Sequence, residues 1–287
     1  MNLQLKKFDM SSIQDDSVVV LIGKRNTGKS FLTKDLLYYH QDVPVGTVIS
    51  PTEQANKFYS NIIPPIFIHD EYTPEITSNI IKRQKKLKNI INNDPSNNLD
   101  IRTFLILDDC LYDNTWQKDK NIRSVFMNGR HFNILFLLTM QFALGIPPNL
   151  RTNIDYVFIL RENIVSNRRR IYDHYAGMFP TFDMFCSTMD QCTENFECLV
   201  ICNNAKSNKI EDQVFWYKAE NHDEFKDYVA IQRTFRYRNQ FIDYSFLNNF
   251  DKLLFIGIEE EFEDLKKVIK NLEFYNCKDF MDMAKII

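Results

Sequence analysis

The chain has 287 residues, of which 44% are hydrophobic and 25% charged, the balance of a globular protein that buries one large core. Its formal net charge of −3 and pI near 6.0 exclude a general attraction to nucleic acid, so any DNA contact must come from a local basic patch or a ring of subunits. No stretch approaches the roughly 20 apolar residues that span a bilayer, so we expect a soluble, unprocessed chain without a transmembrane segment.

A phosphate-binding loop follows the first predicted strand, residues 17–22, and precedes a helical pattern over residues 29–39. Eight residues match the pattern G-x-x-x-x-G-K-[ST]: Gly23, Lys24, Arg25, Asn26, Thr27, Gly28, Lys29 and Ser30. The two glycines would let the backbone N–H groups wrap a triphosphate. Because Lys29 would reach the β- and γ-phosphates and the Ser30 hydroxyl would hold Mg²⁺, the motif predicts ATP and Mg²⁺ as ligands.

Apolar runs of strand length alternate with helical patterns through the first 160 residues, which indicates a mostly parallel sheet with helices on both faces. The expected strands cover residues 17–22, 47–50, 104–107, 133–140 and 156–160. The expected helices cover residues 29–39, 74–91, 116–128, 167–175 and 182–191. Since residues 134–138 are continuously apolar, as in a strand buried on both faces, we place that strand at the centre of the sheet.

The character of the chain changes near residue 220. Strands over residues 197–203 and 213–218 are expected to close the far edge of the sheet. Beyond them, residues 225–249 are rich in aromatics and arginine, and residues 259–275 carry apolar side chains at helical spacing. We therefore divide the chain into an α/β domain over residues 1–220 and a mainly helical C-terminal extension over residues 221–287.

Two carboxylates, Asp108 and Asp109, end the predicted strand 104–107 and supply the second element that a P-loop ATPase requires. Asp108 would complete the Mg²⁺ shell, and Asp109 would orient or deprotonate the water that attacks the γ-phosphorus. Gln141 ends the next buried strand, where it fits a γ-phosphate sensor that also orients this water.

Arginines complete the expected catalytic set, because phosphoryl transfer spreads negative charge over the γ-oxygens and a guanidinium from a neighbouring subunit can stabilise it. The candidates are Arg130, Arg151 and Arg161, of which we favour the first two.

Six cysteines are expected to remain reduced, because a core of this size needs no disulfides. Four of them, at positions 186, 192, 198 and 202, lack the paired C-x₂-C spacing typical of zinc sites, so we interpret them as small apolar residues.

Taken together, the motifs resemble one family. They are the phosphate loop 23–30, the segment 44–53, the acidic strand 105–110, the segment 128–131 and the strand end 139–141. This combination is similar to the poxvirus-type genome-packaging ATPases of nucleocytoplasmic large DNA viruses, which belong to the FtsK-HerA superfamily of P-loop NTPases. The similarity covers roughly residues 10–220. One departure is the acidic pair, which is Asp-Asp here and usually Asp-Glu in cellular members.

The resemblance implies a RecA-like ATPase core that forms a homo-oligomeric ring and drives double-stranded DNA into a preformed capsid, irrespective of sequence. By position, it implies that Lys29 and Ser30 bind the nucleotide and Mg²⁺, that Gln141 is the sensor, and that Arg130 or Arg151 acts across subunits. It also implies capsid or membrane-associated virion proteins as partners, and a location in the virion or the viral factory of the host cytoplasm.

Three basic clusters could contact DNA phosphates. The first places five positive charges in seven residues, Lys82 to Lys88, although such runs also occur on solvated helix faces. The others are Arg168, Arg169 and Arg170, and the aromatic-rich segment with Arg233, Arg236 and Arg238.

Other functions stay open at this point. A P-loop nucleotide kinase could use Arg168 to Arg170 as a lid, and a virion scaffold protein could bind a nucleotide without hydrolysing it. A GTPase is disfavoured, because the best match to its N-K-x-D motif, residues 208–211, ends in Glu211.

Overall fold

The computed structural model describes residues 4–63, 67–93, 100–110, 115–143 and 145–222. The chain divides into two compact units, residues 1–72 with 102–236 and residues 73–101 with 237–287. The first unit holds every described strand. The described part of the second consists mainly of helix α3 (Pro74–Asn93). The expected extension lies outside the described residues from position 223 onward, so the division at residue 220 stays a prediction.

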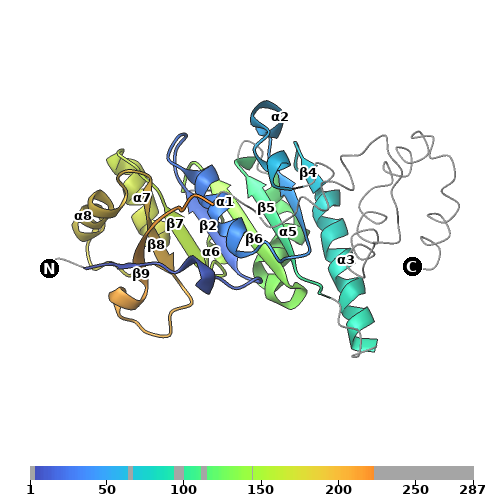
Figure 1. Ribbon diagram of the computed structural model, residues 1–287. Helices are drawn as coiled ribbons and strands as arrows, with labels where there is room; N and C mark the ends of the chain where they lie inside the picture. The colour runs from blue at the N-terminus through green and yellow to red at the C-terminus, as the bar shows by residue number, and fades with distance from the viewer. Residues whose placement is uncertain (1–3, 64–66, 94–99, 111–114, 144, 223–287) are drawn as a thin grey trace, which may run out of the picture. The chain divides into compact units, whose positions relative to one another are not determined.

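Nine strands of the described chain form one sheet in the order β1-β9-β8-β7-β2-β6-β5-β3-β4 (Figure 1). They are β1 (Lys6–Lys7), β2 (Val18–Ile22), β3 (Val45–Ile49), β4 (Ile68–His69), β5 (Thr103–Asp108), β6 (Ile134–Met140), β7 (Tyr156–Ile159), β8 (Glu197–Cys202) and β9 (Val214–Lys218). Neighbouring strands are parallel except β7 with β8 and β8 with β9, which are antiparallel. The predicted α/β class with a mostly parallel sheet is confirmed.

Every residue of the interior strands β2, β3, β5, β6 and β7 is buried. The continuously apolar β6 is an interior strand as expected, although β2 holds the central place in the order. Strands β1 and β4 are not among the expected strands, because two residues each are too few to produce a recognisable alternation of apolar and polar side chains. Their pairing with β9 and β3 makes them strands, and β1 rather than β9 forms that edge of the sheet.

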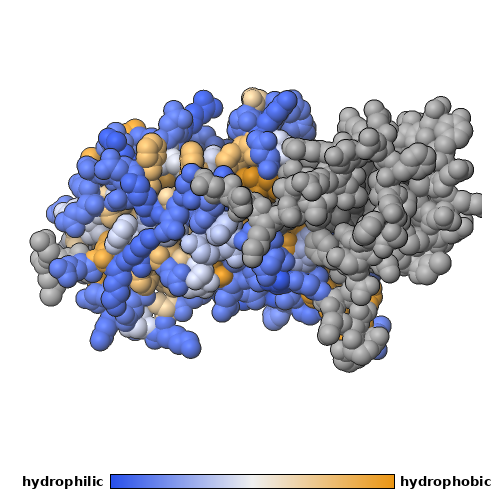
Figure 2. Space-filling view, in the orientation of Figure 1, coloured by the Kyte–Doolittle hydropathy of each residue, from blue (hydrophilic) through white to orange (hydrophobic). Residues whose placement is uncertain are grey.

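Helices of the first unit connect these strands. They are α1 (Lys29–Tyr39), α2 (Glu53–Asn56), α4 (Thr115–Lys118), α5 (Lys120–Asn128), α6 (Pro148–Arg151), α7 (Val165–Tyr175) and α8 (Phe182–Cys192). The single helix expected over residues 116–128 is two, because Asp119 adopts an extended backbone and its Oδ1 accepts a hydrogen bond from the Asn121 N–H at 2.7 Å. None of the described helices has the length and apolar character needed to cross a membrane. Hydrophilic side chains cover most of the described surface that Figure 2 shows.

The topology gathers four strand ends at one edge of the sheet. Because β2, β5, β6 and β7 run parallel, their carboxyl ends meet there. The chain leaves β2 as the phosphate loop, β5 at Asp109, β6 at Gln141 and β7 toward Glu162. Residues far apart in sequence thereby come together.

Candidate nucleotide site

The phosphate loop has the backbone geometry that its glycines permit. Gly28 caps α1 with a left-handed φ of 104°, and Asn26 has a φ of 60°. At Gly23 there is no room for a side chain, because a Cβ would lie 2.6 Å from Thr27 Oγ1 and 2.9 Å from Leu160 Cβ. The loop is therefore closely packed against the end of β7.

Lys29 lies inside this loop, with only 8% of its surface exposed. Its Nζ donates to the carbonyl oxygens of Gly23 at 2.7 Å and Lys24 at 3.2 Å. Burial lowers the pKa of Lys29, and the carboxylates of Asp109 and Asp108 partly oppose this shift. A buried ammonium at the first turn of a helix is suited to binding phosphate oxygens.

The structure brings Lys29 and Asp109 together, since Nζ of the lysine lies 3.8 Å from Oδ1 of the aspartate. Asp109 follows β5 in a left-handed conformation with a φ of 51°, which is uncommon for a residue with a side chain. Its Oδ1 is buried and has no hydrogen-bond partner in the described chain, while Oδ2 accepts from Gln141 Nε2 at 3.0 Å. One carboxylate oxygen is therefore held in place and the other faces Lys29.

Asp108 is buried at the end of β5 between two neighbouring strands. Thr139 on β6 donates to its Oδ1 at 2.6 Å, and Ser50 after β3 donates to its Oδ2 at 3.1 Å. Burial raises the pKa of Asp108, and these two hydrogen bonds oppose the shift. The sequence alone does not predict either hydroxyl as a partner of Asp108, because only the strand order shows that β3 and β6 flank β5.

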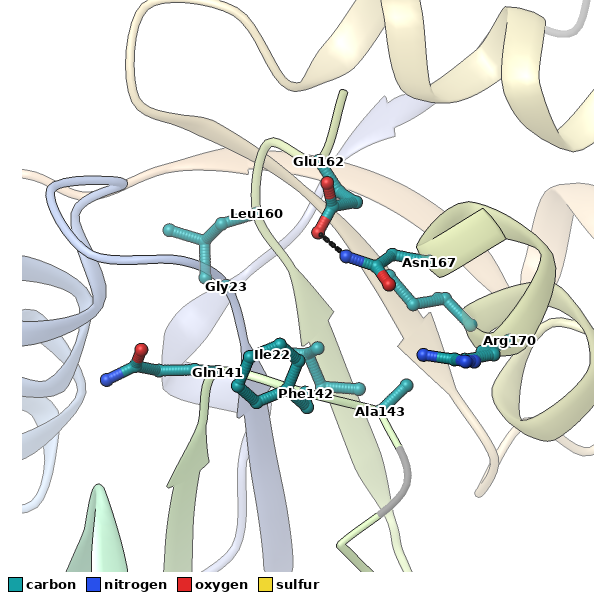
Figure 3. Close-up of a pocket in the computed structure, with 10 residues that line it drawn as sticks. Ile22, Gly23, Gln141, Phe142, Ala143, Leu160, Glu162, Asn167 and Arg170 are labelled. Atoms are coloured by element: carbon teal, nitrogen blue, oxygen red, sulfur yellow. Dashed lines mark hydrogen bonds between the residues drawn. The ribbon is translucent and has the colours of Figure 1, made fainter. Parts of the chain in front are cut away.

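A pocket opens beside the loop between the ends of β2, β6 and β7 (Figure 3). Its lining includes Gly23, Gln141, Glu162 and Arg170. Glu162 is 4% exposed and accepts hydrogen bonds from the Ile164 N–H at 2.8 Å and from Asn167 Nδ2 at 3.0 Å. It therefore fixes the start of α7.

Glu162 also holds the phosphate loop, since its Oε1 lies 2.5 Å from Lys24 Nζ. Burial acts to raise the pKa of Glu162, but the hydrogen bonds from Lys24, Ile164 and Asn167 outweigh it and lower the pKa. The sequence alone does not predict this role of Glu162, because the residue belongs to no local motif.

The candidate arginines lie in different places. Arg130 forms an ion pair with Asp155, which precedes β7, so it lies at the amino-terminal edge of the strands, opposite the phosphate loop. Arg151 lies over the Tyr175 ring at 5.9 Å. Arg161 is exposed and follows Leu160, whose side chain packs against the loop. The structure thus places Arg130 away from the loop of its own subunit, and Arg151 beside the end of α7.

The basic clusters differ in their exposure and in their ion pairs. On α3, Lys82, Lys85 and Lys86 are exposed, whereas Arg83 is buried. Arg168 pairs with Asp190 at 2.6 Å, and Arg169 pairs with Asp173 at 3.2 Å. The third cluster, with Arg233, Arg236 and Arg238, lies outside the described residues.

The four clustered cysteines lie on α8 and β8, with Cys192 and Cys198 buried. Burial raises the pKa of the Cys192 thiol to about 12, which keeps it protonated.

Comparison with known proteins decides the family. The family model for the poxvirus A32 protein matches residues 5–213. The chain belongs to this family. Among relatives of this A32-family chain, protein L437 of Acanthamoeba polyphaga mimivirus is 39% identical over 239 residues, 78% of this chain and 82% of the relative. Protein 075L of Invertebrate iridescent virus 6 is 43% identical over 209 residues, 72% and 79% of the two chains. Both relatives are viral proteins.

Solved structures share the fold of this A32-family member. The genome packaging NTPase B204 of Sulfolobus turreted icosahedral virus 2, solved with ATP-γ-S, aligns with a TM-score of 0.51 and 15% identity, covering 73% of this chain and all of B204. This likeness confirms the fold expected of the core.

Proposed function

We propose that this A32-family chain is an ATPase that uses hydrolysis to move double-stranded DNA into a viral capsid. The observation that carries the proposal is the 3.8 Å approach of Asp109 to Lys29, which joins a phosphate-binding loop to a carboxylate from another strand. The B204 protein is named as a genome packaging NTPase and binds ATP-γ-S, which supports the same activity for a chain of this fold.

The residues present fit a magnesium ion bound with the nucleotide. Ser30 is exposed on the first turn of α1, and Asp108 presents a carboxylate at the end of β5. Hydroxyl and carboxylate oxygens are ligands that Mg²⁺ prefers. When bound, the ion would neutralise charge on the β- and γ-phosphate oxygens. Thr139 and Ser50 would hold the Asp108 carboxylate in one orientation through their hydrogen bonds.

Asp109 is suited to activate water. Gln141 fixes one of its oxygens, and the other is buried without a hydrogen-bond partner in the described chain, so it can accept a proton or a hydrogen bond from a water molecule. Lys29 would at the same time contact the phosphates that this water attacks.

A ring of subunits would complete the site. Arg130 lies at the opposite edge of the sheet from its own loop, so it can act only on the nucleotide of a neighbouring copy. A packaging role further predicts capsid or membrane-associated virion partners, in the virion or the viral factory. The exposed lysines of α3 would bind DNA phosphates irrespective of sequence.

The two other functions fit the site less well. A nucleotide kinase would need its lid arginines to reach a second phosphate. Arg168 and Arg169 pair with Asp190 and Asp173 instead, and of the three lid arginines Arg170 alone lines the pocket. A non-hydrolysing scaffold protein would not need a carboxylate held beside Lys29 by a glutamine.

ATP turnover by the purified full chain, with and without double-stranded DNA, tests the proposal. We expect turnover that DNA stimulates, and its loss in Asp109→Asn with nucleotide binding retained, because the amide cannot accept the proton. Asp183→Asn, an exposed aspartate on α8, is the matched control and should keep wild-type turnover. Nucleotide binding without turnover under any DNA condition would favour the scaffold protein instead.

A further inference from the structure

An exposed aromatic ring lies against the phosphate loop and has no role in the function proposed above. Phe196 is 66% exposed, although phenylalanine is usually buried. A Cβ built on Gly28 would lie 3.5 Å from Cδ1 of Phe196 and 3.7 Å from Cδ2 of Leu160. The ring is therefore adjacent to the loop glycine, with most of its surface open.

The backbone that presents this ring is unusual. The Glu197 N–H donates to the Glu194 carbonyl at 2.8 Å and closes a tight turn, in which Asn195 has a φ of 49° and Phe196 a φ of 67°. Asparagine tolerates this left-handed region and glycine favours it, whereas a phenylalanine there is strained. Because the ring is mostly exposed, its burial does little to offset the strain of this backbone. Packing therefore does not explain why phenylalanine stands at this position. Strained residues of this kind cluster at ligand sites.

The strand order places the ring at the nucleoside end of the site. Asp109 and Gln141 follow β5 and β6 and mark the γ-phosphate end, on one side of the central β2. Phe196 precedes β8, which lies on the other side of β2, beyond β7. Since β8 is antiparallel to β7, its start lies at the edge where the phosphate loop emerges. A triphosphate with its γ-phosphate beside Asp109 directs its nucleoside toward β7 and β8.

We propose that Phe196 is the stacking platform for the base of the bound nucleotide. The proposal rests on the proposed function in taking a nucleoside triphosphate as the ligand and in placing its γ-phosphate beside Asp109. Stacking on an aromatic ring needs only a planar π-face, so the ring would add affinity for any nucleobase and none for the phosphates.

The test measures, on the full chain, the Kd of a non-hydrolysable ATP analogue and the Kd of inorganic tripolyphosphate. The variant Phe196→Gly removes the ring and suits the left-handed backbone, so it should fold at least as well as wild type. We expect it to raise the Kd of the ATP analogue about tenfold, within the range of base stacking, and to leave the Kd of tripolyphosphate unchanged. Phe196→Trp should restore the affinity, and its fluorescence should respond to the ATP analogue and not to tripolyphosphate.

Phe31 provides the matched control, since it is 65% exposed on the first turn of α1 in ordinary helical backbone. Phe31→Ala should change neither constant by more than about twofold. The proposal is overturned if Phe196→Gly weakens both ligands equally, because the ring would then only support the loop, or if it weakens neither. A wild-type chain that binds the ATP analogue but never hydrolyses ATP contradicts the proposed function and leaves the stacking measurement valid.

Discussion

Gln141 donates a hydrogen bond from Nε2 to Oδ2 of Asp109 over 3.0 Å, which joins the ends of two neighbouring parallel strands. This contact leaves the other Asp109 oxygen facing Lys29. A carboxylate in a left-handed backbone needs such a restraint to keep one orientation. The glutamine therefore holds one oxygen of the Asp109 carboxylate in place.

Replacing Gln141 by leucine removes the amide at nearly constant volume. We expect Gln141→Leu to lower kcat about 100-fold and to leave nucleotide Kd unchanged, because the restraint on Asp109 matters in the transition state. Steady-state ATP turnover together with nucleotide titration measures both quantities. Met127→Leu, an exposed position on α5, serves as the control. An increase in KM at constant kcat would instead assign Gln141 to ground-state binding.

Much of this site could be predicted from the sequence, because its parts are local. The bounds of α1 are those expected, since the loop motif and the helical pattern adjoin in the chain. Strands β5 and β6 agree with the expected ranges within one residue at each end, because continuous apolar runs have visible limits.

What could not be predicted depends on the strand order. The hydrogen bond from Thr139 to Asp108 joins residues that are neighbours only because β5 pairs with β6. The contact between Glu162 and Lys24 likewise requires β7 to lie beside β2. Neither pair produces a periodicity or a spacing in the sequence from which the contact could be predicted. The exposed ring of Phe196 was missed for the same reason, because β8 reaches the phosphate loop only through β7.

Arg130 offers a test of the proposed ring of subunits. We expect Arg130→Ala to lower turnover without changing nucleotide binding, because a residue supplied across an interface acts on the transition state. Mixing it with Lys29→Ala subunits should restore part of the activity, since an intact loop would then face an intact arginine. The structure adds a control, because Arg130 also pairs with the buried Asp155. If Asp155→Asn lowers turnover equally, or if mixing restores nothing, the ion pair inside one subunit explains the effect.

The next prediction is that the exposed lysines of α3 bind DNA. Lys85 and Lys86 are exposed, and we expect Lys85→Glu with Lys86→Glu to lower DNA-stimulated turnover while the DNA-independent rate stays unchanged. The dependence of DNA affinity on salt, measured by titration, should lose a log–log slope of about 1 to 2. Lys206→Glu with Lys209→Glu changes the same charge at exposed positions between β8 and β9. If the two double variants lower DNA-stimulated turnover equally, the change in net charge explains the result, and the lysines of α3 have no specific role in DNA binding.

The stability of the domain should depend on pH through Asp15. His40 Nδ1 donates to one Asp15 oxygen at 2.6 Å, and Arg102 to the other at 2.6 Å. The hydrogen bond from His40, with help from Arg102, outweighs burial and lowers the pKa of Asp15 to about 2. Because the folded pKa lies below the unfolded value of 3.8, the charged carboxylate stabilises the fold above that value, and the effect is lost as the pH falls toward 2.

We therefore expect Asp15→Asn to reduce the free energy of unfolding by about 1 kcal/mol at neutral pH, a value discounted for the partial exposure of the side chain. The difference from wild type should shrink progressively below about pH 4. Urea unfolding of both proteins at pH 7, 4 and 3 measures it. The neighbouring Asp16→Asn removes the same charge without these two partners and should show a smaller effect at neutral pH. A difference between Asp15→Asn and wild type that stayed constant with pH would mean that packing, rather than the ionised carboxylate, stabilises this corner of the domain.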